Sequence, residues 1–167
     1  MLYNCSELIE LNVSNFDTSK VKNFSLTFYG CSKLTKLDVS KWNTSEVRYF
    51  GNGVNANGGI FQGCSSLEEL DVSNWDVSQA IDMSNMFNGC SGLTELNVSN
   101  WDTSRVAKIF GTFQGCRKLA KLDVSKWNTS NLITCGQNGW GYGGTFQGCS
   151  SLEELDISNW DVSKVTD

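Results

Sequence analysis

The side chains through which this chain could do chemistry are seven cysteines and eighteen Asp and Glu residues, because the sequence contains no histidine. Histidine is the commonest general base and a frequent metal ligand, so any reaction would depend on thiols, carboxylates and hydroxyls alone. None of the cysteine spacings forms a CxxC zinc motif. The sequence therefore predicts no catalytic residue, no metal site and no cofactor, and we do not expect an enzyme.

Six of the cysteines recur at intervals of 26, 33, 26, 26 and 33 residues. They are Cys5, Cys31, Cys64, Cys90, Cys116 and Cys149. Three successive intervals sum to 85 residues, so residues 61–78 and 146–163 are identical except at Val72 and Ile157. Self-similarity at a fixed period is the signature of a repeat architecture. The spacing predicts a single repeat domain over residues 1–167, in which an 85-residue superrepeat occurs about twice and each cysteine is the centre of one coil.

Each repeat has one pattern of apolar residues around its cysteine. A large apolar residue lies three positions before it, leucines follow at three and six, and an aromatic follows at eleven, as in Phe61, Leu67 and Trp75. Alternation of polar and apolar residues over 69–72 predicts a short strand with one buried face. The segment 85–89, which ends in glycine, predicts a short helical turn. One coil buries too little apolar surface to be stable alone, so the coils must stack.

The repeated phrase Phe-x-Gly-Cys-Ser-x-Leu-x-x-Leu-Asp-Val-Ser-x-Trp-Asp-Thr-Ser resembles the repeats of BspA-type leucine-rich-repeat surface proteins and related bacterial surface lipoproteins. The resemblance covers essentially the whole chain. It implies a mainly β, right-handed, leucine-rich-repeat-like solenoid, here of six stacked coils with short helical turns and uncapped ends. It also implies display outside the cell for adhesion or partner binding, and it brings no catalytic residues. The chain departs from it by a seven-residue insertion in each 33-residue coil.

Stacking has a consequence for the cysteines. Equivalent atoms of adjacent coils lie about 4.8 Å apart, within the Cα range of a disulfide. Their Cβ vectors point the same way, however, which is poor disulfide geometry. We expect reduced, buried cysteines that act as small apolar residues. Cys135 lies outside the regular spacing, in an insertion, and is expected to be the accessible thiol.

A charged residue follows each cysteine by five positions, on the exposed face of the predicted strand. These residues are Glu10, Lys36, Glu69, Glu95, Lys121 and Glu154. A lysine flanked by glutamates on both neighbouring coils favours one register through exposed ion pairs of about 0.2–1 kcal/mol each. Two interpretations stay open: a solvated charged face, or a surface that recognises a ligand.

Asp and Asn recur seven and twelve positions after the cysteines, as at Asp71 and Asp76. Oxygen-rich clusters suit calcium. The spacing lacks the GGxGxD pattern of calcium-binding β-rolls, and about half of these residues are Asn. Asx turns at the corners of the coils explain the pattern more simply.

The insertions occupy residues 51–59 and 135–144 and are rich in Gly and Asn, which is typical of loops. They supply the other candidate binding residues. These are Trp140, Tyr142 and Asn138 in the second loop and Asn52, Val54 and Asn55 in the first. Aromatic residues on a loop are favoured contact residues, but they can equally fold back over the coils as a lid.

The ends of the chain align with the middle of the superrepeat. Met1 corresponds to Met86 and Asp167 to Asp82, so only three residues, matching 83–85, separate one copy from the next. An uncapped stack exposes its edges and apolar faces. Either the segment belongs to a longer repeat protein, or copies stack head-to-tail.

The composition of the chain limits the kinds of partner that it can bind. The net charge of −5 and the absence of long apolar runs argue against nucleic acid and against a membrane span. We expect an extracellular or cell-surface protein that binds a protein or glycan on another surface. The alternative is a structural filament subunit whose copies stack end to end.

Overall fold

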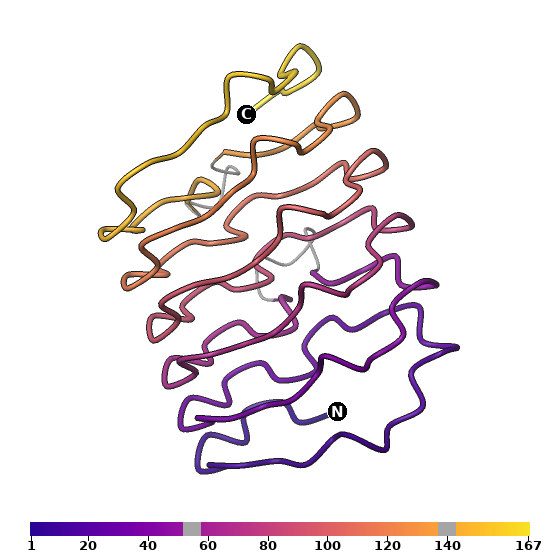
Figure 1. Cartoon of the computed structure of the whole chain (residues 1–167), viewed down its shortest axis with the longest axis vertical. Helices are drawn as coiled ribbons and strands as arrows, with labels where there is room; N and C mark the ends of the chain where they lie inside the picture. Colours follow the sequence, from indigo (N-terminus) through magenta and orange to yellow (C-terminus); the bar gives the residue numbers. More distant parts are fainter. Residues whose placement is uncertain (52–57, 137–142) are drawn as a thin grey trace.

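The computed structural model describes residues 1–51, 58–136 and 143–167. The chain passes through successive turns that lie one above another, from the N-terminal turn at the bottom of Figure 1 to the C-terminal turn at the top. We number these turns as coils. Coil 1 is 2–27, coil 2 is 28–60, coil 3 is 61–86, coil 4 is 87–112, coil 5 is 113–145 and coil 6 is 146–167.

The described residues form no helix and no extended strand, and their β-structure consists of isolated parallel bridges. Each bridge joins residues 26 or 33 positions apart, so the pairing is between coils. One row joins Glu10 to Lys36 and Glu95 to Lys121, and the other runs through Asn23, Tyr49, Asp82, Lys108 and Thr134. The expected strand does not form over 69–72, which takes part in no bridge, and only single bridging positions occur in the equivalent segments of other coils. The backbone bonds between coils are sparse there, as in Thr94 N to Glu68 O at 3.4 Å.

The predicted helical turn over 85–89 is wrong, and the hydrogen bonds show why. Phe87 N and Gly89 N donate to the next coil, to Thr112 O at 2.8 Å and Gln114 O at 2.7 Å. Asn88 N, between them, closes a four-residue turn to Asn85 O at 3.1 Å, and Cys90 N after them closes another to Phe87 O at 3.0 Å. Because every second donor is used between coils, no run of helical bonds forms. Gly89 has a φ of 74°, a left-handed angle that suits glycine.

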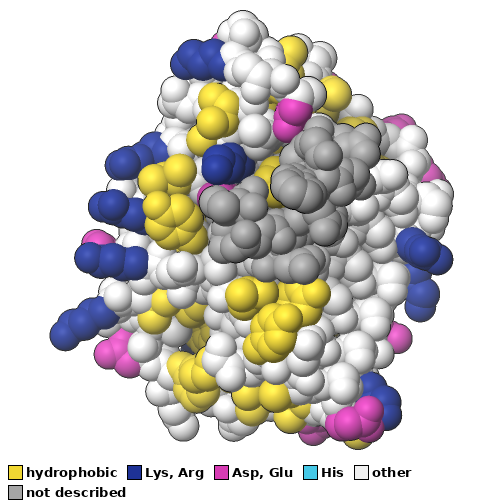
Figure 2. Space-filling view, turned by 180° about the vertical axis from the view of Figure 1, so that it is seen from behind, with side chains coloured by type: hydrophobic (Ala, Val, Ile, Leu, Met, Phe, Trp, Pro, Cys, Tyr) yellow, Lys and Arg dark blue, Asp and Glu magenta, His cyan; other side chains and the backbone are white. Residues whose placement is uncertain are grey.

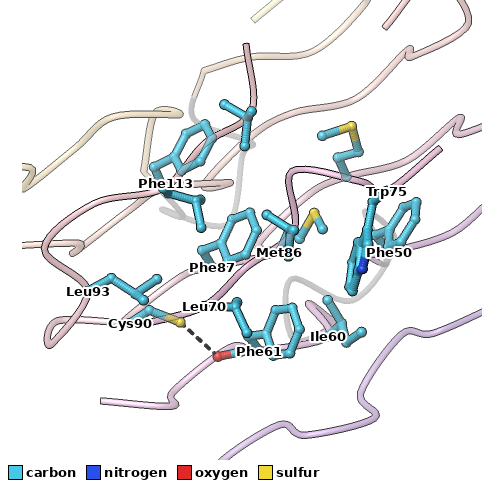
Figure 3. Packing of buried hydrophobic residues seen from close by; sticks show 14 of the residues in the cluster. Phe50, Ile60, Phe61, Leu70, Trp75, Met86, Phe87, Cys90, Leu93 and Phe113 are labelled. Atoms are coloured by element: carbon cyan, nitrogen blue, oxygen red, sulfur yellow. Dashed lines mark hydrogen bonds between the residues drawn. The ribbon is translucent and has the colours of Figure 1, made fainter. Parts of the chain in front are cut away.

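The core consists of side chains stacked in rows that run through the coils. The Phe row crosses Figure 3, where the centroids of Phe61, Phe87 and Phe113 lie 5.7 Å apart. A parallel Trp row has spacings of 6.1–6.3 Å. Each Trp Nε1 donates to a Val carbonyl of the preceding coil, as in Trp75 to Val39 at 3.0 Å. Burial of each such side chain contributes about 1.5–3 kcal/mol, so every coil is stabilised mainly by its neighbours.

Both insertions begin and end at one point of the coil. Phe50 O accepts from Ile60 N at 2.9 Å, and Cys135 O accepts from Thr145 N at 3.0 Å. In coil 3, which has no insertion, the same site is a four-residue turn over 83–86, in which Met86 N donates to Met83 O at 3.2 Å. The insertions therefore replace one turn and leave the path of the coil unchanged.

The position of Cys135 corrects the expectation for that residue. It is equivalent to Phe50 and Met83, at the edge of the core, and it packs against the buried cluster. Its exposure is intermediate, in the same class as Cys5 and Cys149. Cys135 is therefore not the single accessible thiol that its place in an insertion predicted.

Candidate binding surface

A shallow groove follows the face of the molecule that carries the predicted strands. It consists of three adjoining depressions with volumes of about 430, 490 and 560 Å³. The first two share Lys36 and Asp38, and the last two share Glu69 and Asp71. We call this surface the strand-face groove. Its charged lining residues are Glu10, Lys36, Asp38, Glu68, Glu69, Asp71, Glu95, Lys121 and Asp123.

The floor of the groove is a narrow apolar strip between two charged rows. In an extended segment successive side chains point to opposite faces, so Glu69 and Asp71 point outward and Leu70 points inward. Leu70 and Leu122 are 7% exposed, and Leu37 is 6% exposed. A partner that lies along the groove would meet an apolar line with charges on both sides.

The row of Asp and Asn residues beside the strip is held by Asx turns. Asp71 Oδ1 accepts hydrogen bonds from Ser73 N at 3.0 Å and Ser73 Oγ at 2.6 Å. These bonds lower the pKa of the Asp71 carboxyl, so it is ionised at neutral pH. The same turn recurs at Asn12, Asp38, Asn97, Asp123 and Asp156. The Asx-turn interpretation is confirmed, and in the described part of the chain no three Cys, Asp or Glu residues group as metal ligands.

The row of Glu and Lys residues is exposed and does not form the ion pairs that its alternation predicted. Within the described residues the one ion pair joins Lys33 and Glu7 at 2.6 Å. Glu10 and Lys36 bridge through their backbones only. Exposed pairs gain little energy from a fixed geometry, so the side chains remain apart and are accessible to a partner.

The structure thus brings most of the predicted strand-face residues together. Glu10, Lys36, Glu69, Glu95 and Lys121 line the groove. Glu154 is exposed on coil 6 but lines none of these depressions. The predicted loop residues lie outside the described part of the chain. They are Trp140, Tyr142, Asn138, Asn52, Val54 and Asn55.

Four of the cysteines are closed to chemistry by their surroundings. Cys31, Cys64, Cys90 and Cys116 are fully buried and unoxidised, as expected. Each thiol also donates to a backbone carbonyl of the preceding coil, a role that the sequence analysis missed. Cys90 Sγ lies 3.0 Å from Phe61 O (Figure 3). Burial raises the pKa of Cys64 from 9.0 to about 12, so this thiol stays protonated and remains a donor.

A signal for this role exists in the sequence. The position holds Cys in all six repeats and never Ala or Val, although these residues would serve equally well as small apolar side chains. A thiol differs from both by carrying a weak hydrogen-bond donor. The invariance within the chain therefore indicates a function for the S–H group.

No helix in the described residues has the length and apolar character needed to cross a bilayer. A family model described as "Mycoplasma protein of unknown function, DUF285" matches residues 1–53 and 55–167. Neither the curated proteins nor the solved structures gave a significant match to the chain.

Proposed function

The chain belongs to the DUF285 family, and we propose that it is a non-enzymatic binding protein that acts at a cell surface or outside the cell. Its repeats resemble those of BspA-type surface proteins, and we propose for it a leucine-rich-repeat-like solenoid of that type. Pairing of residues 26 or 33 positions apart supports this architecture, because the pairing distance equals the repeat length.

The observation that carries the proposal is the strand-face groove. It extends over coils 1 to 5, and its charged side chains are exposed. A narrow cleft for a small substrate would enclose its ligand, whereas this shallow surface suits a long contact with a macromolecule. The partner is a protein or glycan on another surface.

The charge of the groove defines the chemistry of that partner further. Near coils 3 to 5 the carboxylates of Glu69, Asp71, Glu95 and Asp123 surround the single lysine Lys121. Groups that donate hydrogen bonds or carry positive charge are therefore favoured opposite this part of the groove. We propose that a basic protein surface is bound more tightly than a neutral glycan.

A charge-reversal experiment tests the groove. The double variant Glu69→Lys/Glu95→Lys and the control Glu46→Lys, an exposed glutamate that lines no part of the groove, are coupled to fluorescent beads. Binding to cultured epithelial cells and to arrays of basic proteins and glycans is measured. We expect the double variant to lose roughly tenfold in binding, about 1.4 kcal/mol, and the control to lose none. Equal binding by the double variant and the wild type would contradict the proposal.

A second variant separates the groove from the insertion loop. Trp140→Ala/Tyr142→Ala removes the two loop aromatics and leaves the groove charges in place. If the groove is the main site, this variant keeps most of the binding that Glu69→Lys/Glu95→Lys loses. If the loop variant loses binding and Glu69→Lys/Glu95→Lys keeps it, the main binding site is the loop and not the groove.

A further inference from the structure

The return segments of coils 2 to 5 form a second regular surface, on another side of the molecule from the strand-face groove. These segments are 46–49, 79–82, 105–108 and 131–134. In coil 3 two turns separate the return segment from the strand segment. Trp75 N donates to Val72 O at 3.1 Å, and Ala80 N donates to Val77 O at 2.8 Å. The chain therefore changes direction between the two surfaces, and we call the second one the return face.

The outward side chains of the return face form a column that crosses the coils. Ile81 N donates to Arg48 O and Ala107 N donates to Ile81 O, both at 2.9 Å, and Ile133 N donates to Ala107 O at the same distance. The residue before each member of the column is buried, as Ala80 is at 0% exposure. Successive side chains of an extended segment point to opposite sides. The column of Arg48, Ile81, Ala107 and Ile133 therefore points outward.

The column is apolar over three adjacent coils. Ile133 is 40% exposed, and Ile81 and Ala107 are partly exposed. Tyr49, beside Arg48, is 41% exposed. Figure 2, which shows the molecule from behind the view of Figure 1, has hydrophobic side chains next to a line of Lys and Arg side chains. Exposed apolar side chains that are gathered together and bordered by polar ones are typical of a contact surface.

The return face is basic, although the chain as a whole has a net charge of −5. Arg48, Arg105 and Lys108 lie on it, and its acidic residues are Glu46 and Asp82. Asp82 is only 4% exposed, so three cations stand against one exposed carboxylate. The strand-face groove has the opposite balance, because carboxylates outnumber lysines in its lining. The two faces of one molecule are therefore complementary in charge.

We propose that the return face of one molecule binds the strand-face groove of a second copy of this chain. This inference rests on the proposed function, because it names a partner for the same groove. In the contact the apolar column of the return face lies along the apolar strip of the groove. Arg48, Arg105 and Lys108 then face the carboxylates on either side of that strip, and opposite charges attract across the contact.

The spacing of the coils favours a second copy over an unrelated partner. Both faces belong to the same stack, so the side chains of each recur at the same distance of about 4.8 Å per coil. The apolar column has members in coils 3, 4 and 5, and so has the strip, through Leu70, Leu96 and Leu122. Two aligned copies therefore keep their contacts from coil to coil, whereas a partner with another repeat distance would lose them.

The contact uses different surfaces on the two molecules, so it does not close on itself. Each bound copy leaves one of its own two faces open for the next copy, and copies add side by side in a row. Because each contact covers only a few coils, it is weak by itself. Many copies displayed on one surface act together and bind more tightly than a single pair.

Sedimentation velocity over a range of protein concentrations tests the proposal with three double variants. The return-face variant is Arg48→Glu/Arg105→Glu, and the groove variant is Glu69→Lys/Glu95→Lys. The control, Arg117→Glu/Lys118→Glu, likewise reverses two exposed cations, and these lie outside both faces. We expect each face variant to raise the Kd for association at least about tenfold and the control to leave it unchanged.

Mixing the two face variants distinguishes loss of the contact from loss of folding. The unchanged return face of the groove variant still fits the unchanged groove of the return-face variant. The two altered faces are also opposite in charge. An equimolar mixture should therefore associate at concentrations where each variant alone is monomeric. The separate variant Ile133→Glu places a charge in the apolar column and should raise the Kd of the otherwise unchanged chain about tenfold.

Association that both face variants lose and their mixture restores supports the proposal. A wild-type chain that stays monomeric up to about 1 mM would overturn it, as would an association that the control weakens equally. If the monomeric chain binds heparin instead, and Arg48→Glu/Arg105→Glu loses that binding, the return face takes an anionic glycan and not a second copy. The proposed function fails separately, when Glu69→Lys/Glu95→Lys binds cells and protein arrays as well as the wild type does.

Discussion

Residues 61–78 in coil 3 and 146–163 in coil 6 have the same sequence except for one position, yet they differ in burial. Val77 is 1% exposed and its equivalent Val162 is 54% exposed. Val72 is 1% exposed and Ile157 is 45% exposed. The apolar pattern of a repeat therefore does not itself determine burial. Burial comes from the coils on either side.

The two segments share their main contacts to the preceding coil, and the large difference between them is the contact with a following coil. Trp75 Nε1 donates to Val39 O at 3.0 Å, and Trp160 Nε1 donates to Val124 O at 3.2 Å. The local Asx turns are also the same in both segments. Coil 6 thus keeps its internal turns and its contacts to the preceding coil, and lacks the coil that would cover its other side.

The largest difference in stability between the two segments should appear when a tryptophan of the Trp row is replaced by alanine. Trp75→Ala removes a side chain that has neighbours on both sides and should cost about 3–5 kcal/mol of unfolding free energy. Trp160→Ala should cost less than half as much, because one side of that ring is already open. Urea unfolding followed by circular dichroism measures both. Equal losses would show that burial by the neighbouring coil is not what stabilises a repeat.

A smaller effect should depend on pH through the buried thiols. Burial raises the pKa of Cys64 to about 12, so the folded state holds this proton more tightly than the unfolded state. The contribution of the thiol is fully present below about pH 9 and falls as the pH rises toward 12, by about 1.4 kcal/mol per pH unit. Cys64→Ala should remove this part of the slope of the unfolding free energy between pH 9.5 and 11, as followed by urea titrations.

Alkylation kinetics provides the matched comparison with coil 6. Cys149 in coil 6 is the equivalent of Cys64 and is half-buried. Iodoacetamide should therefore modify Cys149 in the folded protein while Cys64 stays unmodified. Mass spectrometry of the digested protein assigns the sites. Modification of Cys64 at the rate of Cys149 would contradict the buried hydrogen-bonded row.

Removing an Asx turn should have the smallest effect on stability, and the effect should be the same in coil 3 and coil 6. Asp71→Ala and Asp156→Ala each remove a turn whose bonds lie within three residues. Both substitutions should lower the urea midpoint slightly and equally. Hydrogen bonds from Ser73 and Ser158 lower the pKa of both carboxyls, so the contribution is present above about pH 4 and is lost as the pH falls further.

The features that could be predicted from the sequence are those that depend on the repeat or on near neighbours. The buried cysteines followed from the repeat, and the turns at Asp71 and its equivalents followed from an Asp or Asn with Ser two positions later. The helical turn over 85–89 failed because local sequence does not show that Phe87 and Gly89 donate to another coil. The place of Cys135 was available by counting 26 residues from Ile109, but its insertion sequence concealed it.

The residues that line the groove could be predicted from the sequence, but whether their charges form ion pairs could not. The positions of Glu69 and Lys121 on one face followed from the strand alternation. Whether these charges pair depends on side-chain conformations in water, where pairing and separation differ by less than about 1 kcal/mol. No repeat pattern contains that information.

The narrow base of each insertion has a consequence for how such a protein changes over generations. Phe50 O and Ile60 N lie 2.9 Å apart, so the two ends of the first insertion meet at one point of the coil. A lineage can therefore exchange residues between the flanking glycines, but not Gly51 or Gly59, where an added Cβ would collide with the backbone oxygens of Ser84 and Asn85. Selection can act on these residues independently of folding, and a protein engineer can graft a foreign epitope at the same place.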